Sequence, residues 1–258
     1  RRRIFIFSVI SLFTLGVFVG GLGTLVGIGG GLILIPIFIF LFNFSPQNAV
    51  ATSLVVVFLN ALSGTFAYIR QDKVFYKAGL PFALATIPGA FIGSYLTEYF
   101  TGESFRLAFG IFILLIATIM LFNTNPPSNH LPFHKKTFQF NQKLGIAIST
   151  LVGFLSSIFG IGGGAIHVPL MIYALKFPIH IATATSHFVL TISSFIAVIS
   201  HFLFGNILMS TALSIGFGAV IGAQIGAKIS QKTKPKYIIT LLAVMLTLMG
   251  LRFIFTAI

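Results

Sequence analysis

Long apolar runs, each of a length that suits a membrane-spanning helix, dominate this sequence. They cover about 4–42, 48–69, 79–96 and 105–122, and then about 143–177, 181–204, 208–228 and 236–257. A helix needs about 20 apolar residues to cross the hydrocarbon core of a bilayer, whereas strands of an outer-membrane barrel would be about ten residues long with alternating polarity. We therefore predict an all-α polytopic membrane protein with about eight transmembrane helices.

Charge is scarce in this chain and mostly positive. Hydrophobic residues make up 57% and charged residues only 7%, and 16 Lys and Arg stand against three acids for a net charge of +13. Most of the cations lie in short gaps between the apolar runs, where the positive-inside bias places them, and not in a cluster on a folded surface as nucleic-acid binding requires. We expect the lipid bilayer as a partner and no nucleic acid. Cysteine is absent, which excludes disulfides and thiolate chemistry.

The two halves of the chain repeat one another. An offset of 133 residues pairs glycines, prolines and threonines in three separate segments without a gap: Gly29 with Gly162, Pro36 with Pro169, Thr52 with Thr185, Gly89 with Gly222, and Gly93 with Gly226. We predict a first repeat at 1–122, a polar linker at 123–143 on the cytoplasmic side, and a second repeat at 144–258. Repeated halves are the usual build of secondary transporters, whose substrate site lies between the repeats near mid-membrane.

A glycine cluster interrupts the first apolar run of each repeat. Gly-Ile-Gly-Gly-Gly at 27–31 returns at 160–164, and a proline follows five residues later in both copies. An unbroken helix over 4–42 would be about 58 Å long, about twice the hydrocarbon thickness. We therefore expect each first unit to be discontinuous or re-entrant, with Gly27, Pro36, Gly160 and Pro169 as hinge or structural positions.

The sequence leaves the number of crossings open. If each broken unit crosses once, the chain crosses eight times and both termini and the linker are cytoplasmic, but 228–236, with its lysines, lies outside. If each broken unit counts as two crossings, there are ten, the halves are inverted, and the linker and 228–236 lie inside while Arg1–Arg3 lie outside. The positive-inside bias does not decide between these arrangements.

Broken backbone at membrane depth is suited to binding an anion. In lipid it survives only where protein buries it or where it lines a wet cavity. A half-helix that begins just after the glycines would point its free N–H groups and positive dipole end at the midplane. We therefore predict that the last three glycines of each cluster bind substrate: Gly29, Gly30, Gly31, Gly162, Gly163 and Gly164. Close packing of helices through small residues is the alternative.

The pattern as a whole resembles the TauE/SafE (TSUP) family of sulfite exporters and related permeases. The resemblance rests on the repeated Gly-Ile-Gly-Gly-Gly-x-x-x-x-Pro and Ala-Thr-Ser motifs, together with Pro-Gly-Ala-Phe-Ile-Gly at 88–93 and Ile-Gly-Ala-Gln-Ile-Gly at 221–226. It implies a permease of the bacterial or archaeal cytoplasmic membrane that moves a small sulfur-containing anion, such as sulfite, sulfoacetate or another organosulfonate. The resemblance does not fix which anion, the direction of transport or the coupling ion.

Polar side chains on the helix after each break are further candidates for binding substrate. Thr52, Ser53 and Asn60 occur in the first repeat, and Thr185 and Ser186 in the second. Their hydroxyl and amide groups could replace part of the hydration of an oxyanion. Hydrogen bonds between helices, or back to the helix backbone, are the alternative role. The duplicated Thr-Ser pairs are the stronger candidates, because a two-fold arrangement would bring both pairs to one site.

Three polar residues of the second half have no polar equivalent in the first. His167 and His187 replace Leu34 and Leu54, and Gln224 lies within the 221–226 motif. We predict that all three contribute to binding, with a histidine as proton carrier or as a cation facing the anion. A histidine bonded to a neighbouring helix is the structural alternative. No carboxylate lies inside a predicted span, which favours a uniporter-like path, a channel-like path or coupling through histidine.

The leading functional prediction is a permease of the inner (cytoplasmic) membrane, not an enzyme, working by alternating access between the two repeats. An anion channel would use the same residues at much higher rates. A histidine-based membrane enzyme or assembly factor is a weaker alternative, because the sequence shows no nucleophile–base pair and no cluster of metal ligands. We expect no metal and no cofactor. The expected partners are a small anionic substrate and the bilayer, and the sequence leaves a homo-oligomer open.

Overall fold

The computed structural model describes residues 2–122, 137–230 and 235–257. These residues form ten helices and no strand: α1 (Arg2–Val26), α2 (Gly31–Phe40), α3 (Pro46–Arg70), α4 (Tyr76–Thr97), α5 (Gly102–Phe122), α6 (Gln142–Phe159), α7 (Gly164–Tyr173), α8 (Ile179–Leu203), α9 (Met209–Ile229) and α10 (Pro235–Phe255). The predicted all-α fold is confirmed. The predicted linker falls mostly outside the described residues.

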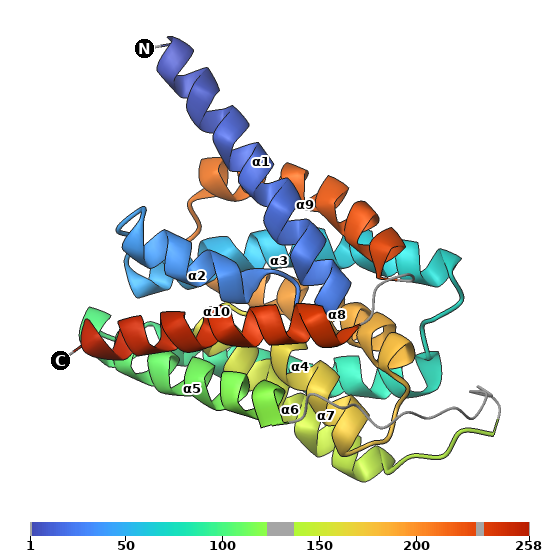
Figure 1. Ribbon diagram of the computed structural model, residues 1–258. Coiled ribbons are helices and arrows are strands. Elements are labelled where there is room, and N and C mark those ends of the chain that lie inside the picture. The colour runs from blue at the N-terminus through green and yellow to red at the C-terminus, as the bar shows by residue number, and fades with distance from the viewer. Residues whose placement is uncertain (1, 123–136, 231–234, 258) are drawn as a thin grey trace.

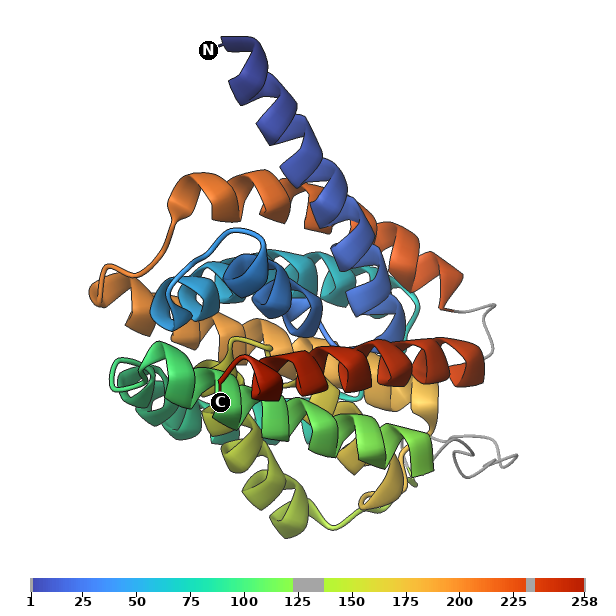
Figure 2. The same ribbon diagram turned by 60° about the vertical axis from the view of Figure 1, so that its left-hand side comes forward.

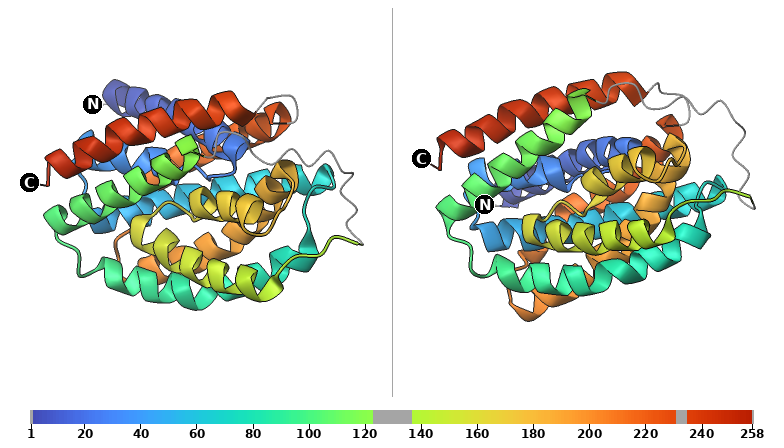
Figure 3. Two further views of the ribbon diagram at one scale, coloured as in Figure 1. Left: turned by 60° about the horizontal axis from the view of Figure 1, so that its bottom comes forward. Right: turned by 90° about the horizontal axis from the view of Figure 1, so that it is seen from below.

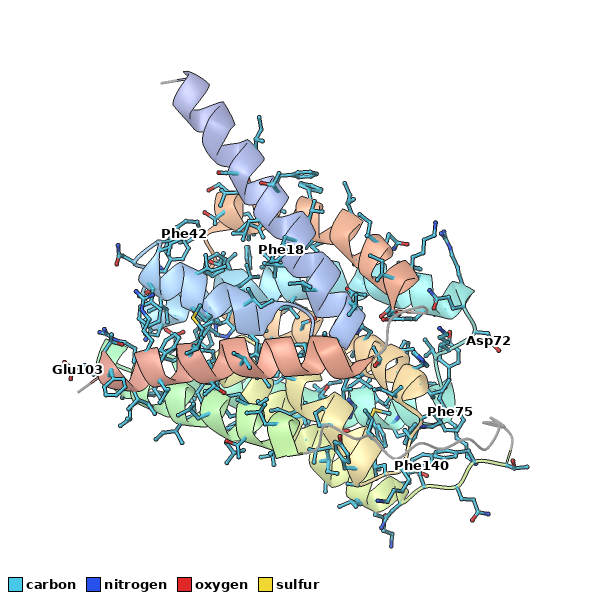
Figure 4. The ribbon with its side chains drawn as sticks, in the orientation of Figure 1. Phe18, Phe42, Asp72, Phe75, Glu103 and Phe140 are labelled. Atoms are coloured by element: carbon cyan, nitrogen blue, oxygen red, sulfur yellow. The ribbon has the colours of Figure 1, made fainter. Side chains whose placement is uncertain are left out.

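The outer surface of this bundle is that of a membrane protein. Seven helices of the described part are long and apolar enough to cross a bilayer, and they are α1, α3, α4, α5, α6, α8 and α9. Large apolar side chains are exposed on the faces that point away from the bundle: Phe18, Leu84, Phe91, Leu115, Phe217 and Leu248. Figure 4 shows Phe18 on the outer side of α1. Lipid covers such faces, since a soluble protein rarely exposes so much contiguous apolar surface.

The helix bounds follow the offset found in the sequence. α2 and α7, α3 and α8, and α5 and α10 each begin and end 133 residues apart. Local signals at the helix starts account for some of these bounds. The Ser45 hydroxyl accepts a hydrogen bond from the Asn48 N–H with Pro46 at the first helical position of α3, and the Asn141 side chain caps α6 in the same way.

The two broken units enter the bundle from opposite ends. α1 runs inward from the end that holds the N terminus, and α2 returns to that same end (Figures 1 and 3). α6 and α7 make the same turn from the other end, while α3, α4, α5, α8, α9 and α10 each run between the two ends (Figure 3). The broken units are therefore re-entrant, so they do not make the two crossings each that the second arrangement counted, but the halves run in opposite directions as that arrangement required.

The long helix of each broken unit packs closely on a helix of the other repeat, with glycines at the contact. α1 crosses α9 (Figure 2), and α6 packs on α4 (Figure 3). A Cβ atom on Gly222 of α9 would collide with the Val17 carbonyl oxygen, and one on Gly89 of α4 would collide with the Thr150 carbonyl oxygen. These glycines allow the backbones to touch, as small residues do between membrane helices. The 88–93 and 221–226 motifs are thus helix contact faces.

Candidate anion site at the crossed helix breaks

The two glycine clusters lie directly against each other. A Cβ atom on Gly31 would lie 2.5 Å from the Gly160 carbonyl oxygen, and one on Gly164 would collide with the Gly27 carbonyl oxygen. The pairs are repeat equivalents, so the contact is two-fold in character. Six glycines of the clusters have φ between +65° and +87°, namely Gly27, Gly29, Gly30, Gly160, Gly162 and Gly163. Only glycine adopts this backbone readily, which explains the residue type.

The breaks lie at the middle of the bundle. Cβ atoms built on Gly29 and on Gly162 would both press on Val57 and Leu190, which are repeat equivalents near the centres of α3 and α8. Val57 and Leu190 are buried, as are all ten residues of the two clusters. The predicted binding glycines are therefore brought together at one central place, shielded from both ends in the conformation described.

Both half-helices begin at this place with unused amide groups. α2 starts after Gly30 and α7 after Gly163, and neither start has a side-chain cap. The N–H groups of Gly31, Leu32, Gly164 and Ala165 have no acceptor among the described residues. Free N–H groups and the positive end of the helix dipole together attract an anion. Pro36 and Pro169 are the sixth residues of α2 and α7, and neither can donate a backbone hydrogen bond.

A serine that the sequence analysis missed lies at the start of α7. The Ser156 hydroxyl is fully buried and has no hydrogen-bond partner. It lies 3.4 Å from the position that a Cβ atom on Gly163 would take. The repeat equivalent of Ser156 is Gly23, so this position offers a hydroxyl to the start of α7 but none to the start of α2. A buried polar group without a partner costs free energy unless a ligand or water satisfies it.

His167 lies in the second turn from the start of α7 and is buried. Its Nε2 atom is 3.2 Å from the Ser149 hydroxyl, which itself donates to the Gly145 carbonyl oxygen at 2.7 Å. Since the Ser149 proton points to Gly145, we assign the His167 tautomer in which Nε2 carries the proton and donates to Ser149. The other ring nitrogen, Nδ1, has no partner. His167 thus has an unused proton-accepting atom near the breaks.

His187 belongs to a buried polar cluster beside the first break. Thr24 donates to the Asn60 side-chain oxygen at 2.7 Å, and the His187 Nε2 atom is 3.4 Å from the same Thr24 hydroxyl. The Tyr68 hydroxyl donates to the Thr24 carbonyl oxygen at 2.9 Å. His187 Nδ1 and the Asn60 amide nitrogen have no partner in the described part of the chain. Two predicted residues, Asn60 and His187, are therefore brought together, through the unpredicted Thr24.

Other predicted residues lie away from the breaks or make hydrogen bonds that connect helices. The Thr52 hydroxyl accepts from the Leu208 N–H at 3.2 Å, and the Thr185 hydroxyl accepts from the Phe75 N–H at 3.0 Å. These equivalent bonds fix the residues just before α9 and α4. Gln224 on α9 is exposed, and its amide donates to the Ser63 carbonyl and hydroxyl oxygens of the neighbouring α3 at 2.7 and 2.8 Å.

Ser53 and Ser186 both lie beside a break but differ in their bonding. Ser53 donates to the Gly160 carbonyl oxygen at 2.8 Å, whereas the Ser186 hydroxyl has no partner. No group of three or more potential metal ligands occurs among the described residues. The centre offers hydrogen-bond donors to a ligand, namely backbone amides at two helix starts and hydroxyl groups.

A polytopic helical bundle with two re-entrant, glycine-broken units opposed at its centre has the architecture of a secondary transporter. The sequence agrees with this architecture, because it matches the family described as sulfite exporter TauE/SafE over residues 12–253. The chain belongs to this family.

Two relatives that align with this chain over nearly their whole length are named as probable membrane transporters. The chain is 37% identical to the probable membrane transporter protein YunE of Bacillus subtilis, an alignment that covers 97% of this chain and 99% of the relative. It is 30% identical to the probable membrane transporter protein MJ0441 of Methanocaldococcus jannaschii, with 93% of each chain covered. No solved structure matches the chain.

Proposed function

We propose that this protein is a permease that carries a small sulfur-containing oxyanion, such as sulfite, sulfoacetate or another organosulfonate, across the inner (cytoplasmic) membrane by alternating access between its two repeats. One observation carries the proposal: the starts of α2 and α7, with their unused amides, face one buried place, and the unpaired Ser156 hydroxyl lies beside one of them. The family description supplies the sulfur chemistry.

The distribution of charge supports an anion as the substrate. Asp72, Glu98 and Glu103 all lie outside the membrane-spanning helices or at their ends. Figure 4 shows Asp72 and Glu103 at opposite ends of the bundle. A transported cation would need carboxylates or several oxygen ligands at mid-membrane, whereas the centre of this protein presents mainly hydrogen-bond donors.

The ends of the bundle differ in charge, which supports one orientation. Cations gather at the end where α3 and α9 finish, and they include Arg70, Lys73, Lys77, Lys143, Lys176 and Lys228. The opposite end has Arg106 and Arg252 together with Glu98 and Glu103, and α1 begins there with Arg2 and Arg3. By the positive-inside bias the first of these ends faces the cytoplasm.

A half-open cavity lies at the opposite end, and we propose it as the place where the anion enters. It encloses about 260 Å³ beside the end of α2 and is lined by Phe40, Asn43 and Arg106, among others. Arg106 is held in place because its Nε and Nη1 atoms donate to the carbonyl oxygens of Gly102 and Thr256. Its positive charge would attract an approaching anion.

Flux in proteoliposomes tests the proposal. Purified protein would be reconstituted and supplied with labelled sulfite, sulfoacetate, taurine-like sulfonates, thiosulfate and sodium as a cation control, each at two pH values. We expect saturable flux of at least one sulfur oxyanion and none of sodium. Absence of flux for every sulfur anion would refute the proposed substrate class. Currents far above carrier turnover would instead identify a channel, and a pH-independent rate would exclude proton coupling through histidine.

A further inference from the structure

Ser53 and Ser186 are identical residues at equivalent positions with unequal bonding. They lie on α3 and α8, 133 residues apart, with exposed fractions of 0% and 1%. Ser53 donates across the repeat boundary to the Gly160 carbonyl oxygen at 2.8 Å, and the Ser186 hydroxyl has no partner.

The acceptor that repeat symmetry assigns to Ser186 is also unused. Gly27 is the equivalent of Gly160, and its carbonyl oxygen accepts no hydrogen bond in the part of the chain described. That carbonyl lies against Gly164, just as the Gly160 carbonyl lies against Gly31. Donor and acceptor of the missing bond are therefore both present, buried and unpaired. Sequence does not explain the difference, because all four positions carry the same residue types in the two repeats.

A neighbouring pair is also unequal, but there the residue types differ. Thr24 donates to Asn60 at 2.7 Å in the first repeat, while the equivalent positions carry Ser157 and Ser193, whose shorter side chains have no hydrogen-bond partner.

Where the residue types also match, one pair of scaffold bonds is made in both repeats: Thr52 with Leu208, and Thr185 with Phe75. The unequal bonds of Ser53 and Ser186 lie beside the breaks, where two inverted repeats must exchange conformations if access is to alternate.

We propose that Ser53 and Ser186 form alternative contacts between the repeats. The bond from Ser53 to Gly160 holds the state described here, and a bond from Ser186 to Gly27 forms in the oppositely facing state, when Ser53 releases Gly160. Each state then has one of the two bonds, so the two states stay close in free energy and a ligand can shift their populations. This inference rests on the alternating-access part of the proposed function and not on the substrate.

The chain lacks cysteine, so paired spin labels can report the two states without background. One pair, Leu41→Cys with Leu203→Cys, labels exposed residues at the ends of α2 and α8; the equivalent pair, Ala174→Cys with Arg70→Cys, labels the opposite end. Distances would be measured in lipid nanodiscs without substrate. Loss of one net hydrogen bond changes a population ratio by about 2- to 10-fold.

We expect Ser53→Ala and Ser186→Ala to shift the distance populations in opposite directions at both ends, and the double variant to return close to the wild type. Ser200→Ala is the matched control, because that buried hydroxyl donates only to the Ile196 carbonyl oxygen of its own helix. Shifts in the same direction, or no shift in folded variants, would overturn the proposal. Because no substrate is present, failure of the sulfur-anion panel would leave this result unaffected, and the converse also holds.

Discussion

At the scale of residues, the centre of this protein is built from backbone that glycine adopts readily. The cluster glycines serve two separate needs, which the structure distinguishes. Gly29 and Gly162 adopt positive φ, whereas Gly31 and Gly164 begin helices and are small because a carbonyl of the other repeat touches them. A substitution at Gly164 therefore tests the contact between breaks without adding backbone strain.

Gly164→Ala is expected to destabilise the protein and abolish transport. The new Cβ atom would collide with the Gly27 carbonyl oxygen, and overpacking of this kind costs about 1–3 kcal/mol. Thermal unfolding in detergent measures the loss. Gly102→Ala is the matched control, since a Cβ atom there meets only the Arg106 side chain at 3.4 Å. Equal unfolding temperatures for the two variants would contradict the backbone contact.

Glu98, which directly follows α4, is a titratable residue outside the membrane-spanning helices. Burial raises the pKa of Glu98 above its ordinary value, and a hydrogen bond from Asn206 lowers that pKa in part. A raised pKa means that the folded state favours the neutral carboxyl. Stability contributed by Glu98 is therefore present at low pH and is lost as pH rises through the folded-state pKa.

We expect Asn206→Ala to raise the pKa of Glu98 further, because the carboxylate loses its donor. Carbon-13 NMR of the carboxyl groups can follow this residue, since the chain has only three acids. The Asp72→Asn and Glu103→Gln background isolates the Glu98 signal. A fall in the pKa on removing Asn206 would show that the contact does not stabilise the charged form.

At the scale of elements, sequence predicted that helices would break but not how the pieces would turn. Glycine clusters followed by proline indicate non-helical backbone, and the half-helices α2 and α7 begin directly after them. Whether a half-helix continues or returns depends on what it packs against, and that is a tertiary property.

For the same reason Gln224 could not be placed, since helical periodicity alone does not tell which face of α9 meets lipid. Ser156 was missed because nothing local marks a serine as unpaired.

The crossings of α1 with α9 and of α4 with α6 predict a matched pair of effects. Gly222→Ala and Gly89→Ala are repeat equivalents, and each new Cβ atom would collide with a carbonyl oxygen of the crossing helix. We expect both variants to lower the unfolding temperature by similar amounts. If either substitution were tolerated, the re-entrant unit that it contacts would not be held as described.

At the scale of the whole molecule, inversion and interlocking are what the proposed alternating access requires. Each repeat holds the broken unit of the other, so movement of one repeat carries the opposite half-helix with it. The basic end and the end with Arg106 then give the two faces of the membrane different electrostatics around one central site. Sequence showed the duplication and the surplus of cations, but the inverted placement required three-dimensional contacts.

An oxyanion bound at the start of α7 would contact the Ser156 hydroxyl, and the Ser156→Ala variant tests this claim. The Ser156 hydroxyl has no protein partner, so its removal is expected to leave the unfolding temperature unchanged or slightly raised. For a sulfur oxyanion that the wild type transports, the variant is expected to raise KM about tenfold or more, the cost of a lost hydrogen bond to a charged group. The control Ser200→Ala is expected to keep the wild-type KM. An unchanged KM in a folded Ser156→Ala variant would contradict the claim.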